Sequence, residues 1–96
     1  MEVYEFLVDE VNEDKFAAHG VTVKQEFQVL DSQHRIIPNK LGRRAPQLLI
    51  GVDHGGGCLV IPIEPTHEEG VWRPITAWPC DDKDRAILSR SGPPRV

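Results

Sequence analysis

The 96-residue sequence predicts an α+β fold, with helices on one face of a small, mostly antiparallel sheet of three to four strands. Two helices are expected before the sheet and one after it. Apolar residues recur at helical spacing near the N-terminus, two β-rich runs flank three successive glycines, and a charged helical segment follows the last β-rich run. We expect one domain over residues 1–90 and a flexible tail over residues 91–96, because so short a chain cannot build two cores.

The first two elements are short helices. One covers residues 7–18 and ends before Gly20, because glycine accepts the left-handed conformation that closes a helix. The other opens at Thr22, with Gln25 three residues later in the capping-box pattern, and continues through Leu30. Helices of this length are marginal alone, so both must pack on the sheet.

The sheet is expected from residues 47–52 and 58–63, which are rich in β-branched residues and are joined by a glycine turn that suits a hairpin. A shorter strand over residues 35–38 precedes them, and another covers residues 71–78. The last helix covers residues 81–89 and opens with acids, as the helix dipole prefers.

Side chains of the 71–78 strand should alternate between two faces. Arg73 would share a face with apolar residues, so it either pairs with an acid such as Glu64 or projects into a concave site. The two tryptophans serve either as core or as a stacking surface for bases. By this alternation one face carries Trp72, Pro74, Thr76 and Trp78, and the other carries Arg73, Ile75 and Ala77.

Charge is segregated along the chain. The net charge is −4, but residues 1–34 hold eight acids and two bases, whereas residues 35–44 hold four bases and no acid. A concentrated basic segment on an acidic body favours a local anion or phosphate contact over a broad nucleic-acid footprint. A solvated basic loop is the alternative. The four bases are Arg35, Lys40, Arg43 and Arg44.

Composition predicts a cytoplasmic protein with no membrane contact, since no apolar run is long enough to span a bilayer and acids stand where a signal peptide carries bases. Cys58 and Cys80 lack C-x-x-C spacing and are expected to be reduced, the alternative being one disulfide. No cofactor or metal is expected, because the histidines lie on separate loops at unrelated spacing. The histidines are His19, His34, His54 and His67.

Four features stand in the same order as in a known family. They are His19-Gly20-Val21 at the end of the first helix, an arginine-bearing segment before the strand ending at Gly51, the 55–57 turn with the 58–63 run, and Arg73-Pro74-Ile75-Thr76-Ala77 before a charged helix. Over most of residues 4–90 the chain resembles the BrnT toxins of bacterial type II toxin–antitoxin systems, which belong with the RelE-like ribonucleases. The resemblance implies a RelE-like fold, an RNA substrate whose cleavage stops translation, a cognate antitoxin, and operator DNA bound only through the antitoxin complex.

The resemblance also implies site residues. His19 matches the family's His-Gly, Arg73 matches the first base of its Arg-x-Ile-Ser/Thr-Ala strand, and Arg43 or Arg44 lies near its pre-strand arginine. The sequence departs from the family at Trp78, which replaces a basic residue. We expect His19, Arg44 and Arg73 to be catalytic, and the residues expected to bind RNA are Lys40, Arg43, Trp72 and Thr76.

RNA cleavage without a metal needs a base for the 2′-hydroxyl proton, cations for the phosphorane and an acid for the leaving oxygen. Arginine stays protonated, so the arginines could only hold phosphate. The proton-transfer group would be His19, His54, His67 or Glu64, and His19 alternatively only caps its helix.

Two functions of different class follow from these residues. One is a ribonuclease toxin. The other is a non-catalytic RelE-like module that docks a small partner protein, which the acidic net charge and Trp78 favour. Homodimerisation stays open in both.

Overall fold

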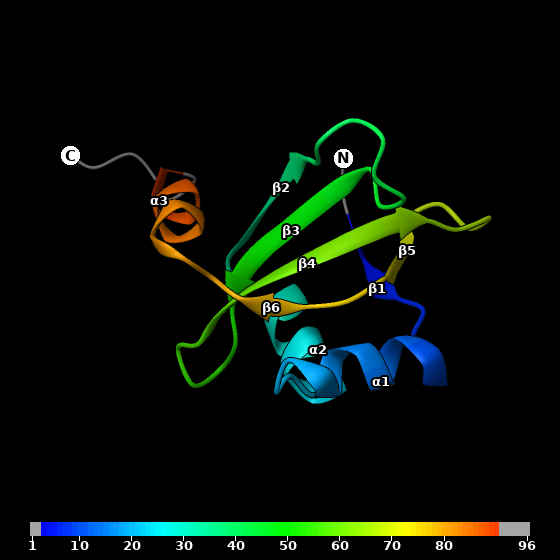
Figure 1. Cartoon of the computed structure of the whole chain (residues 1–96), viewed down its shortest axis with the longest axis horizontal. Helices are drawn as coiled ribbons and strands as arrows, with labels where there is room; N and C mark the ends of the chain where they lie inside the picture. Colours follow the sequence, from blue (N-terminus) through cyan, green and yellow to red (C-terminus); the bar gives the residue numbers. More distant parts are fainter. Residues whose placement is uncertain (1–2, 91–96) are drawn as a thin grey trace.

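The computed structural model describes residues 3–90, so the predicted tail at 91–96 lies outside the described residues. Six strands form one sheet in the order β1-β5-β4-β3-β2, and β6 pairs with β4 (Figure 1). The predicted α+β class is confirmed, although the sheet has more strands than expected. The elements are β1 Glu5–Phe6, α1 Glu10–Ala18, α2 Val23–Asp31, β2 His34–Pro38, β3 Gln47–Val52, β4 Cys58–Pro65, β5 Val71–Pro74, β6 Trp78–Pro79 and α3 Asp82–Arg90.

Local hydrogen bonds account for the starts of α1 and α2. Asp9 caps α1 by accepting from the backbone N–H of Asn12 at 2.9 Å, so α1 begins later than the sequence predicts. Residues 7–9 are irregular, and β1 just before them pairs in parallel with β5, which makes the sheet mixed. Thr22 and Gln25 form the predicted capping box of α2, each accepting from the other's backbone N–H.

The sheet has an apolar core on each face. Against one face pack Phe16 of α1 and Val29 of α2, over Leu49 and Ile61 of the central strands. Because successive strand residues point to opposite faces, Ile50 and Val60 form a second cluster on the other face. Ile87 and Leu88 of α3 cover that cluster. The expectation that all helices share one face is therefore wrong, since the central strands are apolar on both sides.

The predicted 71–78 strand is two strands, β5 and β6. Pro74 pairs with Ile63 of β4, and Trp78 pairs with Val60. The segment takes four steps along the chain where β4 takes three, so it carries one extra residue. An extra residue in a ladder reverses the side-chain alternation. Trp72 consequently packs against the core under α1 and α2, and Trp78 packs with the Ile50 cluster on the opposite face. The predicted shared face of the tryptophans is wrong.

The expectation of two reduced cysteines is also wrong. Cys58 and Cys80 form a disulfide, with their Cα atoms 5.3 Å apart. Antiparallel pairing of β6 with β4 brings Cys80 opposite Cys58, and the Cys80 N–H donates to the Cys58 carbonyl at 2.9 Å. Their sequence separation of 22 conceals a contact that depends on this strand pairing.

Gly51 allows α2 to approach β3 closely. A Cβ there would lie 2.8 Å from Val29 Cγ1, 2.9 Å from His34 Cβ and 3.0 Å from the Gln33 carbonyl oxygen. We expect Gly51→Ala to lower the free energy of unfolding by about 2 kcal/mol through overpacking. Gly20→Ala enters open space and should cost about 1 kcal/mol, because Gly20 has a φ of 74°. Denaturant titrations measure both, and a smaller loss at Gly51 would contradict the close contact.

Candidate RNA-binding groove

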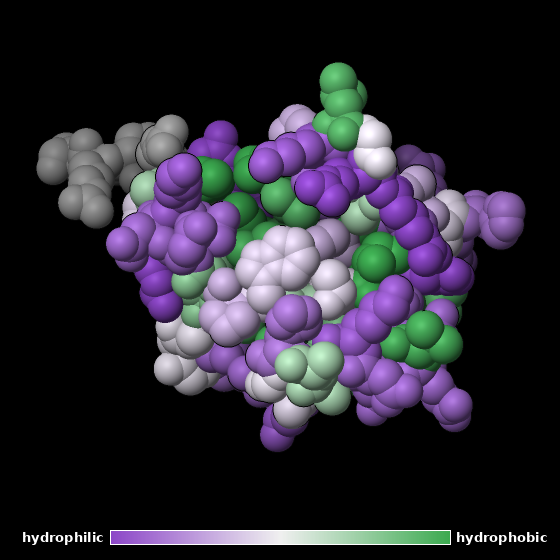
Figure 2. All heavy atoms as spheres, in the orientation of Figure 1, coloured by the Kyte–Doolittle hydropathy of each residue, from purple (hydrophilic) through white to green (hydrophobic). Residues whose placement is uncertain are grey.

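A groove of about 520 Å³ opens on the sheet face away from α1 and α2. The β2–β3 loop contributes Arg43 and Arg44 to one side, Pro62 of β4 lines the groove between, and Trp78 of β6 lies on the other side. The space-filling view shows pale atoms of intermediate hydropathy at the centre of the molecule, with both hydrophobic and hydrophilic atoms around them (Figure 2). The volume is in the range of small-ligand sites, which is large enough for a nucleotide.

Asn39 closes the base of the β2–β3 loop with hydrogen bonds, and this holds the loop's cations at the groove. The Asn39 N–H donates to the Pro46 carbonyl at 2.9 Å, and its side-chain amide donates to the Ala45 carbonyl at 2.8 Å. Gly42, with a φ of 82°, lets the loop reverse. Four residues predicted from the sequence therefore line one groove: Lys40, Arg43, Arg44 and Thr76.

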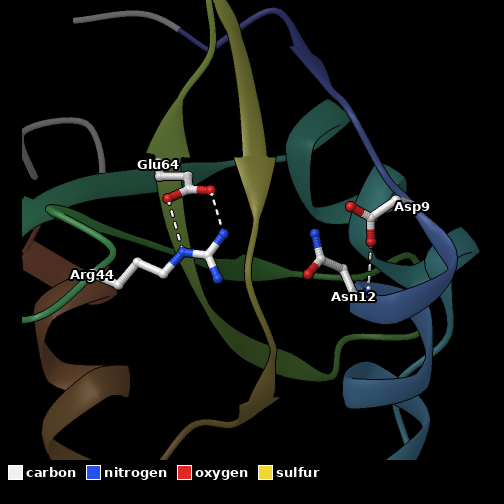
Figure 3. Close-up of polar contacts among 4 residues, drawn as sticks. All are labelled: Asp9, Asn12, Arg44 and Glu64. Atoms are coloured by element: carbon white, nitrogen blue, oxygen red, sulfur yellow. Dashed lines mark hydrogen bonds and ion pairs between the residues drawn. The ribbon is translucent and has the colours of Figure 1, made fainter.

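Arg44 makes a two-point ion pair with Glu64 at the edge of this groove (Figure 3). The distances are 3.2 Å from Nε to Oε2 and 3.0 Å from Nη2 to Oε1. The hydrogen bond and negative charge of Glu64 raise the pKa of Arg44, with a smaller contribution from the charge of Asp9. A carboxylate in an arginine fork has the geometry in which arginine also binds a phosphate.

Arg73 lies opposite Glu64 across the β4–β5 ladder, yet Glu64 forms its ion pair with Arg44. The Nε of Arg73 is buried and has no hydrogen-bond partner within the described residues. Arg73, Glu64 and His67 line a second hollow. Of the two alternatives for Arg73, pairing with Glu64 or facing a concave site, the structure shows the second. Glu64 thus lies between two arginines.

His19 ends α1, where its backbone N–H donates to the Phe16 carbonyl at 3.0 Å. Its ring lies edge-on to the ring of Trp78, with the centroids 6.5 Å apart. Trp78 lines the groove and His19 does not, so His19 reaches the groove only through its contact with Trp78. The predicted helix-capping position of His19 is therefore present, together with a ring contact to a residue of the groove.

Trp72 lies away from the groove. It packs on the core under α1 and α2, and it lines a small hollow beside the β4–β5 loop. His54 lies in the β3–β4 turn. It lines a separate hollow together with Tyr4 and Phe27. The sequence did not predict that Glu64 pairs with Arg44, nor that Trp78 lines the groove while Trp72 does not. The one-residue shift between β5 and β6 hides Trp78, and no local signal pairs Glu64 with Arg44.

The glycine turn between β3 and β4 is organised by Asp53. Hydrogen bonds from the Gln25 side chain and from the backbone N–H groups of Gly57 and Gly55 lower the pKa of Asp53. Asp53 thus fixes the turn against α2. Across residues 3–90, no three side chains of His, Cys, Asp or Glu gather as metal ligands.

The chain was compared with known protein families and with curated proteins. No protein-family model matches the chain, and no curated protein matches it significantly. In the described part of the chain, no helix has the length and apolar character to cross a membrane.

Proposed function

We propose that this chain is the toxin of a bacterial type II toxin–antitoxin pair, a metal-independent ribonuclease that cleaves RNA in the cytoplasm and so inhibits translation. The observation that carries the proposal is the groove, where the cations of the β2–β3 loop face Thr76 and Trp78. Cations hold the phosphates of single-stranded RNA, and an aromatic ring stacks on its bases. The resemblance of the His-Gly and Arg-Pro-Ile-Thr-Ala segments to BrnT toxins supports the same function.

In this proposal the arginines act through charge. Arg44 and Arg73, on either side of Glu64, hold the scissile phosphate and stabilise the negative charge of the phosphorane. His19, beside Trp78, gives or takes a proton, for which an imidazole is suited near neutral pH. A cognate antitoxin restrains the activity, and operator DNA is bound only by the complex of the two proteins.

A non-catalytic module that docks a small protein is the second candidate. Two observations favour it. The Arg44 fork is already occupied by Glu64, and a hollow beside α2 is lined by Tyr4 and Phe27, which are 72% and 40% exposed. Exposed aromatic residues around a hollow are typical of protein-docking surfaces.

Inducible expression in a bacterial host tests the ribonuclease. We expect the wild type to arrest growth and to fragment RNA on a denaturing gel, and we expect Arg44→Ala and Arg73→Ala to do neither, because the phosphorane loses a cation. Circular dichroism checks that both variants fold. Arg85→Ala removes an exposed cation from α3, away from the groove, and should keep full activity. Arrest that survives both arginine changes contradicts the catalytic site, and an inactive wild type favours the docking module.

A further inference from the structure

The Cys58–Cys80 disulfide encloses one wall of the groove. It joins the first residue of β4 to the residue that follows β6. Glu64, Arg73 and Trp78 all lie within the loop that it closes. The bond therefore constrains the segment that faces the basic β2–β3 loop.

The noncovalent support of β6 is small. β6 is two residues long and pairs with β4 at Leu59 and Val60, and one further backbone hydrogen bond joins Cys80 to Cys58. So short a strand pair is marginal without additional packing. Trp78 is only two residues from Cys80, so the disulfide adds a covalent restraint close to its ring, beside the packing of the ring on the Ile50 cluster.

The disulfide also restrains α3, which begins two residues after Cys80. α3 is nine residues long, and it rests on the Ile50 cluster through Ile87 and Leu88. Arg35 adds a long hydrogen bond from Nη1 to the Ile87 carbonyl, at 3.4 Å. A helix of this length depends on its tertiary contacts, and its tether to β4 keeps those contacts close.

The two sulfur atoms differ in access. Cys58 is 3% exposed, whereas Cys80 is only half-buried, so Cys80 is the end of the bond that lies nearer to solvent. Attack by one thiolate of a dithiol reductant forms a mixed disulfide with Cys80 and releases Cys58 as a thiolate, which takes up a proton. The second thiol of the reductant then releases Cys80. Two electrons pass to the protein, leaving two protein thiols and the cyclic disulfide of the reductant.

We propose that the Cys58–Cys80 bond is a redox latch on the groove. The oxidised form holds β6 on β4, with Trp78 beside His19 and facing the cations. Reduction by a dithiol of the kind that keeps cytosolic thiols reduced frees β6 and α3, opens this wall and weakens RNA binding. Cytosolic disulfides are usually transient and redox-sensing, which agrees with this role. The RNA-binding consequence rests on the proposed function, whereas the movement of Trp78 does not.

Trp78 fluorescence tests the latch in a Trp72→Phe background, where Trp78 is the remaining indole. We compare the oxidised protein, the same protein reduced with dithiothreitol, and its Cys80→Ser and Cys58→Ser variants. Reduction should shift the emission to longer wavelength and raise quenching by acrylamide about twofold, because the ring gains solvent. Both serine variants should give the reduced signal with or without dithiothreitol. Affinity for a fluorescent single-stranded RNA should fall about tenfold on reduction, the loss expected for one base stack.

Thiol titration must show two free thiols after reduction, and far-UV circular dichroism must show that the fold persists. Unchanged Trp78 emission in the reduced protein overturns the latch, and so does global unfolding, which makes the bond a structural staple. If Trp78 moves and RNA binds equally to both forms, control of the groove is overturned. If Trp78 moves and neither form binds RNA, the latch stands and the ribonuclease proposal fails.

Discussion

Replacing Glu26 with glutamine is expected to raise the free energy of unfolding by about 3 kcal/mol at pH 7. Glu26 lies on α2 with none of its side chain exposed, and neither carboxyl oxygen has a hydrogen-bond partner within the described residues. Burial raises the pKa of Glu26 from 4.5 to about 9. At pH 7 the folded protein therefore holds a neutral carboxyl, whereas the unfolded chain holds an ionised one.

The consequence is a stability that depends on pH. Between pH 4.5 and about 9 the folded state binds a proton at Glu26 that the unfolded state has released, so raising the pH favours unfolding. The neutral carboxyl contributes fully to the free energy of unfolding below pH 4.5. Above pH 4.5 this contribution falls, and each pH unit lowers the folding equilibrium constant by up to about tenfold. Glutamine cannot ionise, so Glu26→Gln should remove this dependence.

Denaturant titrations from pH 4 to pH 9 measure the difference between Glu26→Gln and the wild type. The two proteins should be equally stable at pH 4 and should diverge as the pH rises. Glu69→Gln, in the exposed β4–β5 loop, controls for the loss of one acid. Parallel profiles for Glu26→Gln and the wild type would show that the carboxyl finds a partner or water in solution.

A second pair of substitutions should change RNA affinity in opposite directions. Arg44→Ala removes a cation from the groove and should weaken binding of single-stranded RNA about tenfold. Glu64→Gln removes the carboxylate that occupies the Arg44 fork, so it should strengthen binding about tenfold, because phosphate no longer displaces an anion. Glu64 is 20% exposed at its side chain, so glutamine remains solvated there.

Fluorescence anisotropy with a 2′-O-methyl RNA measures both affinities without cleavage. For Arg44→Ala the slope of log affinity against log salt should also fall by about one, the signature of a lost phosphate contact. Arg85→Ala on α3 is the matched control and should keep both the affinity and the slope. Weaker binding by Glu64→Gln would show that Glu64 serves to position Arg44, and an unchanged salt slope in Arg44→Ala would remove Arg44 from the phosphate contact.

The features that the sequence predicted well depend on interactions between near neighbours. The Thr22–Gln25 capping box, the glycine turn held by Asp53 and the full extent of β3 each depend on a few adjacent residues or on a simple alternation of side chains. The sequence also predicted that the cations lie together, because they are clustered in one short loop. Short-range interactions of this kind are present in any fold that the chain adopts.

The remaining features depend on contacts between distant segments. A single extra residue between β5 and β6 places Trp78 on the groove and separates it from Trp72, and that residue is visible only when both strands are aligned with β4. The same alignment brings Cys80 to Cys58. The partner of Glu64 is Arg44 from a separate loop, because the pairing of Gln47 with Ile63 places the end of that loop beside Glu64. Side-chain alternation has a period of two, so a shift of one residue reverses every later face, and local sequence carries no record of the shift.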